Sequence, residues 1–244
     1  KRVASLTFPK NITKEVVIIN DASTDKSVEF INEVIKNKYK DTEFLLLENK
    51  RNKGKSQTVK KGVLHSTGDL VVVQDADLEY DPNDLVKFTK IFLSDPHLDV
   101  IYGNRFNKKN EFYNLVHSLG NRFVTATSNL LTRSKGFAPK DMETCYKMVR
   151  GNVMKSLFQS LESESNFGLE PELTAKLARY RKFNGRKLSF KEVDIYYKPR
   201  DISQGKKMKW FQHGFEALLE ILYFNTNSFV VEEMYRGEKI KRKF

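Results

Sequence analysis

Asp75 and Asp77, separated by the small residue Ala76, follow an apolar run at residues 70–73. Where the backbone turns just past a strand, both carboxylates are able to converge on one cation. Mg²⁺ and Mn²⁺ suit this arrangement, because they bind a few carboxylates and complete their shell with substrate phosphate oxygens. Glu79 is a further candidate ligand, directly or through water. The alternative is a solvated turn whose acids cap the next helix, and an Asp-x-Asp pattern alone does not separate the two.

A further acid and a basic loop indicate nucleotide binding. Asp21 follows the β-branched run at residues 16–19, and a carboxylate at a strand end can accept hydrogen bonds from a base N–H or from ribose hydroxyls. Lys53, Gly54 and Lys55 form a basic loop ahead of an expected helix, which is a candidate anion contact. No second glycine precedes them at the phosphate-loop spacing, so an ATPase of that class is disfavoured.

Basic residues also follow two later strand-like segments. Arg105 follows residues 100–102, and Arg200 follows residues 190–197, with Lys206 close behind it in the chain. Arginine suits phosphate because its planar fork binds two oxygens at once. Taken singly, each of these residues is better explained as an ordinary surface cation.

Strand-like and helix-like segments alternate through the first half of the chain. The expected strands are residues 16–19, 44–47, 70–73 and 100–102. This alternation predicts an α/β fold with a doubly wound sheet and right-handed crossovers, and such sheets bind ligands at the carboxyl ends of their strands. Asp21 and the Asp75–Asp77 pair both lie at such ends. The acidic clusters are therefore expected at the ligand-binding edge.

The second half is less regular. We expect helices over residues 114–131 and 170–180, a strand over 190–197, and an amphipathic helix over 210–224. Packing against the domain is the default explanation of the last helix, and a membrane surface is the alternative.

The composition limits the classes of molecule that the chain is expected to bind. The 244 residues suffice for one large α/β domain, and their net charge of +12 suits nucleic acid, anionic lipid or a phosphate-rich substrate. Ten Lys and Arg stand against three acids between residues 181 and 212. The interleaved aromatic and basic residues of RNA-binding sheets are missing, so nucleic acid is disfavoured. The single cysteine, Cys145, excludes an intrachain disulfide and is expected to be a buried apolar residue.

The chain shows no targeting or spanning segment. No run approaches the roughly 20 apolar residues of a membrane span. The sequence begins at Lys1 without an initiator Met or a signal peptide, so we expect a fragment of a longer protein.

Several motifs resemble those of family 2 inverting glycosyltransferases. Residues 17–25 (VIINDASTD) resemble the family's "IIVDDGSTD" segment, residues 49–55 its "N-x-G" loop, and residues 68–79 its "GD…DADLQ/E" segment. Later motifs resemble the polyprenyl-phosphate glycosyltransferase branch, which includes dolichol-phosphate mannose synthase and undecaprenyl-phosphate sugar transferases. These motifs are YGNRF at 102–106, DMETCYK at 141–147, FGLEPE at 167–172, and YKPR with GKK within 197–207. The resemblance runs from about Glu15 to Phe224.

The resemblance implies a GT-A type fold, which is a Rossmann-like, doubly wound mixed sheet that binds a nucleotide-sugar. We expect it over residues 1–200, with a basic, amphipathic C-terminal segment over 201–244. The family's first strand, a "P-V/A-Y-N-E" segment that helps to hold the base, has no counterpart ahead of residue 15. Either that strand is missing from this chain or the donor site is incomplete.

The implied reaction moves a hexose, with inversion, from a UDP- or GDP-sugar to a dolichyl or undecaprenyl phosphate, with Mg²⁺ or Mn²⁺, at the cytoplasmic face of a membrane. The resemblance also implies roles for individual residues. These are catalytic roles for Asp77, Arg105, Asp141 and Arg200, substrate binding by Asp21, Lys55, Asp75, Ala76 and Lys207, and metal binding by Asp75, Asp77 and Glu79.

The negative charge of the acceptor phosphate indicates which residues bind it. A phosphate oxygen is already anionic at pH 7, so no strong base is needed, and Asp141 has the alternative roles of shaping the sugar pocket or ordering basic side chains. Arg105, Arg200 and Lys207 are the preferred acceptor-phosphate ligands. The basic residues within 181–212 are expected to hold that phosphate and face anionic headgroups, with the lipid tail near residues 210–224. A family 2 enzyme with a sugar-hydroxyl acceptor is the alternative, and it would need a committed base.

Overall fold

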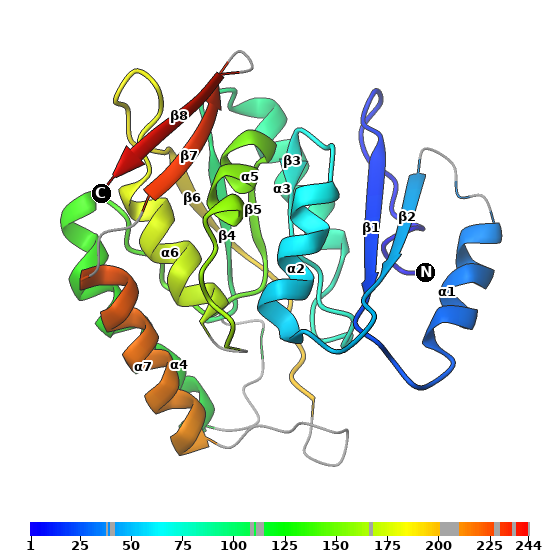
Figure 1. The fold of residues 1–244 in the computed structure, drawn as a ribbon, viewed down its shortest axis with the longest axis horizontal. Helices are drawn as coiled ribbons and strands as arrows, with labels where there is room; N and C mark the ends of the chain where they lie inside the picture. The colour runs from blue at the N-terminus through cyan, green and yellow to red at the C-terminus, as the bar shows by residue number, and fades with distance from the viewer. Residues whose placement is uncertain are drawn as a thin grey trace.

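The computed structural model describes residues 1–37, 39, 42–107, 110, 115–165, 168–200, 210–226, 230–235 and 238–243. Its elements are shown in Figure 1 and follow in the order β1 (Lys14–Asn20), α1 (Ser27–Lys36), β2 (Thr42–Glu48), α2 (Gly54–His65), β3 (Leu70–Val71), α3 (Asn83–Ser94), β4 (Val100–Asn104), α4 (Leu115–Thr132), η1 (Arg133–Lys135), β5 (Lys147–Arg150), α5 (Gly151–Gln159), α6 (Leu169–Arg179), β6 (Phe190–Asp194), α7 (Trp210–Thr226), β7 (Val230–Tyr235) and β8 (Glu238–Lys243).

A mixed sheet in the order β3-β5-β4-β6 forms the centre of the fold. β4 is parallel to β6, whereas β5 is antiparallel to both β3 and β4. The expected α/β class with a mixed sheet is confirmed. The described strands nevertheless do not form one continuous sheet, because β1 and β2 pair in parallel only with each other and lie beside the central sheet (Figure 1). β7 and β8 form a separate hairpin.

Differences from the expected elements have local causes. The strand expected over residues 70–73 is hydrogen-bonded in the sheet only at Leu70 and Val71. Val72 and Val73 still pack in the core, and the Val73 carbonyl accepts a hydrogen bond from Cys145 Sγ at 3.4 Å. β5, α5 and the β7–β8 hairpin were not expected from the sequence.

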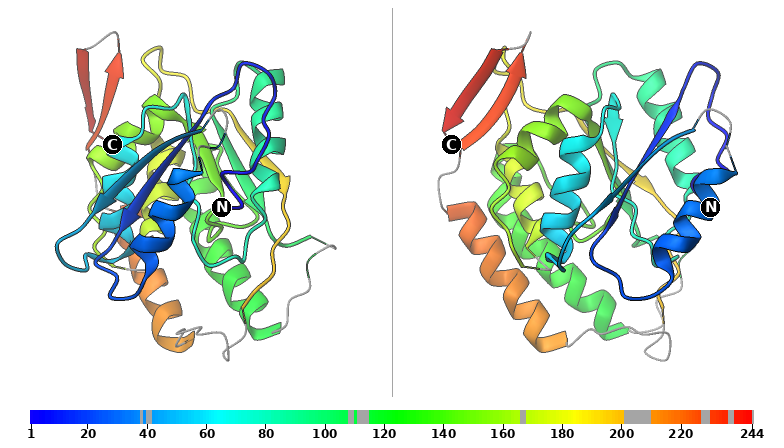
Figure 2. Two further views of the ribbon diagram at one scale, coloured as in Figure 1. Left: turned by 90° about the vertical axis from the view of Figure 1, so that its right-hand side faces the viewer. Right: turned by 45° about the vertical axis from the view of Figure 1, so that its right-hand side comes forward.

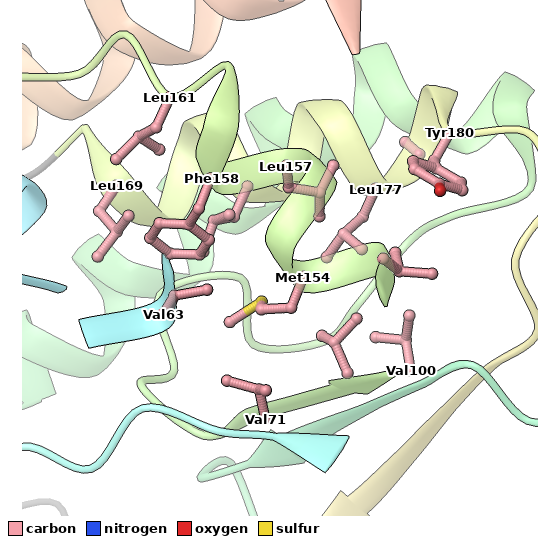
Figure 3. Close-up of a cluster of buried hydrophobic side chains, with 14 of the residues drawn as sticks. Val63, Val71, Val100, Met154, Leu157, Phe158, Leu161, Leu169, Leu177 and Tyr180 are labelled. Atoms are coloured by element: carbon pink, nitrogen blue, oxygen red, sulfur yellow. The ribbon is translucent and has the colours of Figure 1, made fainter. Parts of the chain in front are cut away.

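One face of the central sheet is covered by α5 and α6. Side chains alternate between the two faces of a strand, so Val100 and Tyr102 of β4 both face this layer. Figure 3 shows Val71 and Val100 beneath Met154 and Leu157 of α5. The resulting cluster is a continuous apolar core, whose burial stabilises the folded state by about 25 cal/mol per Å² of apolar surface.

The opposite face packs against α3. Ile101 of β4 points to this side and joins Phe88 of α3 and Tyr146, all of them almost inaccessible to solvent. A smaller cluster of Val124, Met142, Ala217 and Ile221 joins α4 to α7, which lie side by side in Figure 2. Within the described ranges, no helix is both long and apolar enough to cross a membrane.

Strand direction determines which segments reach the ligand-binding edge. Because β5 runs antiparallel to β3 and β4, its first residue, Lys147, lies at the edge where β3 and β4 end. The segment 141–146, which precedes β5, therefore meets the segment that follows β3. The first turns of α2 and α6 reach the same edge through Lys55 and Glu170, whose side chains contact each other.

Gly151 at the start of α5 holds the entrance to β3 in place. Its N–H donates to the Asp69 carbonyl oxygen at 2.7 Å. A Cβ atom on Gly151 would lie only 2.2 Å from the Gly68 carbonyl oxygen, a distance that requires the backbone to move. Close approach therefore demands glycine at this position.

We predict that Gly151→Ala destabilises the protein by about 1–3 kcal/mol, the usual cost of overpacking. Thermal unfolding measures the effect. Gly214→Ala is the matched control, because a Cβ there meets nothing within 4 Å and alanine is favoured within a helix. An unchanged midpoint for Gly151→Ala would contradict the close packing of residues 68 and 151.

Candidate active site

Asp75 and Asp77 lie just beyond the end of β3, each beside a cation from a distant part of the chain. Lys55 Nζ is 3.3 Å from Asp75 Oδ2, and Arg200 Nη2 is 3.2 Å from Asp77 Oδ2. The two carboxylates are partly exposed, and Ala76 between them is exposed. The structure therefore places Lys55 beside Asp75 and Arg200 beside Asp77.

The turn after Asp77 is locally strained. Leu78 has a φ of +65° and an exposed side chain, which is an unusual conformation for leucine. Asp77 Oδ1 accepts a hydrogen bond from the Glu79 N–H at 3.1 Å across this turn. The turn directs Glu79 into the protein, where it is buried. Strained residues of this kind concentrate at functional sites.

Glu79 holds the segment that ends at Arg200. It accepts hydrogen bonds from Tyr197 Oη at 2.7 Å, from the Arg200 N–H at 3.1 Å and from Arg200 Nε at 3.2 Å. Arg200 thus bridges Glu79 and Asp77. The metal-binding role expected for Glu79 stays a prediction.

The electrostatics at Asp77 favour a cation. Burial raises the pKa of Asp77, and the neighbouring carboxylates of Glu79 and Asp75 raise it further, whereas the Glu79 N–H and Arg200 lower it. Within the described ranges, no three His, Cys, Asp or Glu side chains form a complete metal cage. The donor set fits Mg²⁺ or Mn²⁺, because these ions take one or two carboxylates together with substrate phosphate oxygens.

Asp21 organises the loop that leads into α2. Its Oδ1 accepts hydrogen bonds from Asn49 Nδ2 at 2.8 Å and from the Lys53 N–H at 2.9 Å, while its Oδ2 accepts one from the Gly54 N–H at 3.0 Å. Burial alone would raise the pKa of Asp21, but these hydrogen bonds lower it below its ordinary value. Gly54 has a φ of +77°, a conformation that favours glycine. Asp21 is thus an ionised anchor for the basic loop.

Lys55 links that loop to α6. Besides Asp75, its Nζ contacts Glu170 Oε1 at 3.0 Å. Burial opposes the charge on Lys55, but Glu170 and Asp75 raise its pKa well above the ordinary value. Lys55 therefore stays a cation between two carboxylates from different elements.

Arg105 and Asp141 form a buried bidentate pair. Arg105 Nε and Nη2 each donate to Asp141 at 2.7 Å, and the Arg105 backbone N–H donates to Asp141 at 3.0 Å. The guanidinium lies over the Tyr197 ring, 5.1 Å from its centroid. Asp141 is completely buried, so the described geometry has it ordering Arg105, one of the roles expected from the sequence.

The basic run between residues 181 and 212 is divided by the fold, which corrects the expectation that all of it faces the acceptor. Lys182 and Arg186 pair with Asp99, which precedes β4 and lies at its amino end. β6 then runs parallel to β4, and among the described residues of this run it is Arg200 that reaches Asp77. Lys206 and Lys207 lie outside the described residues.

Glu143 and Lys147 are two further charged residues of this edge. Both belong to the DMETCYK motif, but the sequence alone assigned a role to neither of them. Lys147 is buried, with its Nζ 5.2 Å from the centroid of the Tyr102 ring, and burial lowers its pKa although Glu170 and Glu143 are near. Burial raises the pKa of Glu143 to about 7, and Glu170 adds to the shift. A lysine that opens a buried strand is the signal that would have drawn attention to them.

A hollow of about 1090 Å³ lies elsewhere, between residues 1–7 and α3. Its lining includes Arg2, Lys87 and Lys90 but neither Asp75 nor Asp77. The hollow is therefore separate from the carboxylates that follow β3.

The family model "Glycosyl transferase family 2" matches residues 2–158. Undecaprenyl-phosphate 4-deoxy-4-formamido-L-arabinose transferase of Edwardsiella ictaluri (strain 93-146) is 25% identical over 148 residues, which are 61% of this chain and 42% of that protein. Poly-beta-1,6-N-acetyl-D-glucosamine synthase of Staphylococcus aureus (strain COL) is 31% identical over 91 residues, which are 37% of this chain and 21% of that protein. The chain thus spans less than half the length of these curated relatives.

Among solved structures, glucosyl-3-phosphoglycerate synthase from Mycobacterium tuberculosis, in complex with Mn²⁺, UDP and glucosyl-3-phosphoglycerate, has a TM-score of 0.57 at 11% identity. The match covers 94% of this chain and 76% of that chain. A second structure of that enzyme, with Mn²⁺, UDP and phosphoglyceric acid, has a TM-score of 0.53 at 12% identity and covers 95% of this chain and 86% of that chain. These likenesses confirm the GT-A type fold.

The pKa of Glu143 predicts a pH-dependent stability difference. The unfolded carboxyl ionises near its ordinary pKa of 4.5, whereas the folded one ionises at about 7, so its contribution to stability is complete below pH 4.5 and lost as the pH rises through 7. Glu143→Gln keeps the neutral form at every pH. We expect its unfolding temperature to rise above that of the wild type between pH 5 and pH 8.

Thermal unfolding across that pH range is the measurement. Glu164→Gln, at an exposed glutamate, should give no such trend. A difference between Glu143→Gln and the wild type that does not change with pH would contradict a raised pKa at Glu143.

Proposed function

Because the chain belongs to glycosyl transferase family 2, we propose that this glycosyltransferase moves a hexose from a nucleoside-diphosphate sugar to a polyprenyl phosphate, with inversion. The observation that carries the proposal is the Asp75 and Asp77 pair at the end of β3, flanked by Lys55 and Arg200. Paired carboxylates between cations suit a divalent ion and the diphosphate that it binds.

The donor would lie along the edge from Asp21 to Asp77. Asp21 would hold the nucleoside end. The first turn of α2 and Lys55 would face the diphosphate, because helix N-termini and lysines favour anions. Asp75 and Asp77 would hold Mg²⁺ or Mn²⁺, with Glu79 as a third candidate ligand. When bound there, the ion neutralises charge that develops on the leaving diphosphate.

The acceptor side follows from the charge of a phosphate. In the proposed step, an acceptor phosphate oxygen attacks the anomeric carbon as the bond from that carbon to the diphosphate breaks, releasing the nucleoside diphosphate. The attacking oxygen is already anionic, so no general base is required, which agrees with an Asp141 that is committed to Arg105. Arg200 is our proposed acceptor-phosphate ligand among the described residues, Lys207 a second one beyond them, and Arg105 a supporting cation.

The similarity to an undecaprenyl-phosphate sugar transferase supports a lipid-phosphate acceptor. The surface of α4 and α7 supports a membrane partner, because large apolar side chains there face solvent. These are Leu119, Phe123, Leu130, Phe215, Leu219 and Leu222. An apolar face of this kind marks a surface for binding. We propose that it meets the cytoplasmic face of a membrane and that the lipid tail of the acceptor lies along α7.

A family 2 transferase with a sugar-hydroxyl acceptor is the second candidate, favoured by the similarity to a poly-N-acetylglucosamine synthase. The two candidates differ in the acceptor. Incubation with UDP- or GDP-hexoses, Mn²⁺ and either polyprenyl phosphate or an oligosaccharide, followed by measurement of released nucleoside diphosphate, separates them. No release with any donor would overturn the assignment as an active transferase.

Asp77→Asn is expected to reduce turnover to background, because the amide lacks the charge that holds the divalent ion. Release of nucleoside diphosphate with Mn²⁺ is the measurement. Asp95→Asn, at the end of α3 and far from Asp77 in the fold, is the matched control and should retain wild-type rates. Wild-type turnover by Asp77→Asn would refute the metal site.

Arg200→Ala is expected to raise the KM for polyprenyl phosphate by about 10- to 100-fold, the loss of a hydrogen bond to a charged group. The KM for the nucleotide-sugar should change much less. Arg186→Ala, whose partner is Asp99, is the control. A mutant that instead loses donor affinity would show that Arg200 belongs to the donor half of the site.

A further inference from the structure

Glu143 lies at the ligand-binding edge, and its Oε1 atom has no hydrogen-bond partner within the described part of the chain. It lies in the segment that runs into β5, and the antiparallel pairing of β5 with β3 and β4 brings this segment to the edge where those strands end. Cys145, two residues later, contacts the Val73 carbonyl just ahead of Asp75. The backbone of this segment is therefore adjacent to the segment that carries the proposed metal ligands.

The exposure of Glu143 differs from that of its neighbours. Among residues 141–149 it is the one that is not fully buried, and Met142 and Thr144 on either side are inaccessible. Its Oε1 atom is nevertheless shielded and has no hydrogen-bond partner among the described residues. A buried acceptor left without a partner destabilises the protein, so a ligand that donates a hydrogen bond to it would be bound more tightly.

The charges that act on Glu143 belong to two groups of the site. The first group is Lys147 with Glu170, and Glu170 is bound in turn to Lys55. The second group is the pair of Arg105 and Asp141, and Arg105 stacks on Tyr197. Glu143 is therefore close enough to both groups to feel their charges.

The chemistry of a free carboxylate selects among the parts of the substrates. Its ionised form repels the donor diphosphate and the acceptor phosphate, and the nucleoside is assigned to Asp21. The remaining part is the sugar, which is uncharged and carries several hydroxyl donors. Arg105 already occupies both oxygens of Asp141, so Asp141 does not offer the same contact.

We propose that Glu143 binds the sugar of the donor by accepting hydrogen bonds from its hydroxyl groups, and so helps to determine which hexose is transferred. This inference rests on the proposed function. It makes Glu143 a specificity residue rather than a base, because the acceptor phosphate needs no deprotonation.

The test compares two ligands that differ only in the sugar. The dissociation constants of UDP-glucose and UDP, and of GDP-mannose and GDP, are measured with Mn²⁺ for the wild type and Glu143→Ala. We expect Glu143→Ala to raise the dissociation constant of the nucleotide-sugar that the wild type binds by about 10- to 100-fold. The affinity for the matching nucleotide should stay unchanged. Glu143→Gln, which retains one acceptor oxygen, should recover part of the loss, and Glu164→Ala should resemble the wild type.

Donors that lack one hydroxyl sharpen the result. For the wild type, the deoxy donor that lacks the bonded hydroxyl should bind more weakly than the full nucleotide-sugar. For Glu143→Ala, the same deoxy donor should bind as well as the full nucleotide-sugar, because the hydrogen bond is already missing. Equal weakening of the nucleotide and the nucleotide-sugar would show a structural role and overturn the inference, as would unchanged binding of both. Wild-type protein that binds no nucleotide at all would overturn the proposed function as well.

Discussion

Charge balance at the carboxyl end of β3 is the constraint on which the site depends. Asp75, Asp77 and Glu79 follow one another there within five residues, and Glu170 approaches them from α6. Carboxylates at such distances raise one another's pKa and oppose folding unless cations stand between them. Lys55 and Arg200 supply those cations from elements on either side. Because the partners are far apart in sequence, this balance exists only in the folded chain.

The carboxylates of the site have different partners and therefore different roles. Asp21 holds a loop, Glu79 holds Arg200 and Asp141 holds Arg105, so these acids act mainly as acceptors for other parts of the protein. Asp75 and Asp77 keep partial exposure, and each is paired with one cation among the described residues. An enzyme whose acceptor is already an anion can use its acids in this way, since it needs electrostatic stabilisation more than proton transfer.

The fold class and the meeting of the strand ends at one edge could be predicted because they depend on local signals. Apolar runs ending in Asp21 and in Asp75 identify strand ends, and the order of strands and helices brings those ends to one edge. The pairing of Arg105 with Asp141 and of Arg200 with Glu79 could not be predicted, because spacing along the chain does not specify contacts over 36 and 121 residues. The role of Glu143 was hidden for the same reason. Its neighbourhood depends on the reversed direction of β5, a short strand that was not expected from the sequence.

The central claim is that the carboxylates after β3 bind a divalent ion together with a nucleoside diphosphate. Electron paramagnetic resonance of Mn²⁺ tests it directly, by measuring the free ion as protein is added with and without UDP or GDP. The account predicts weak binding of Mn²⁺ alone, much tighter binding when one of the nucleotides is present, and loss of that enhancement in Asp77→Asn. Mn²⁺ binding that neither nucleotide nor Asp77→Asn changes would contradict it.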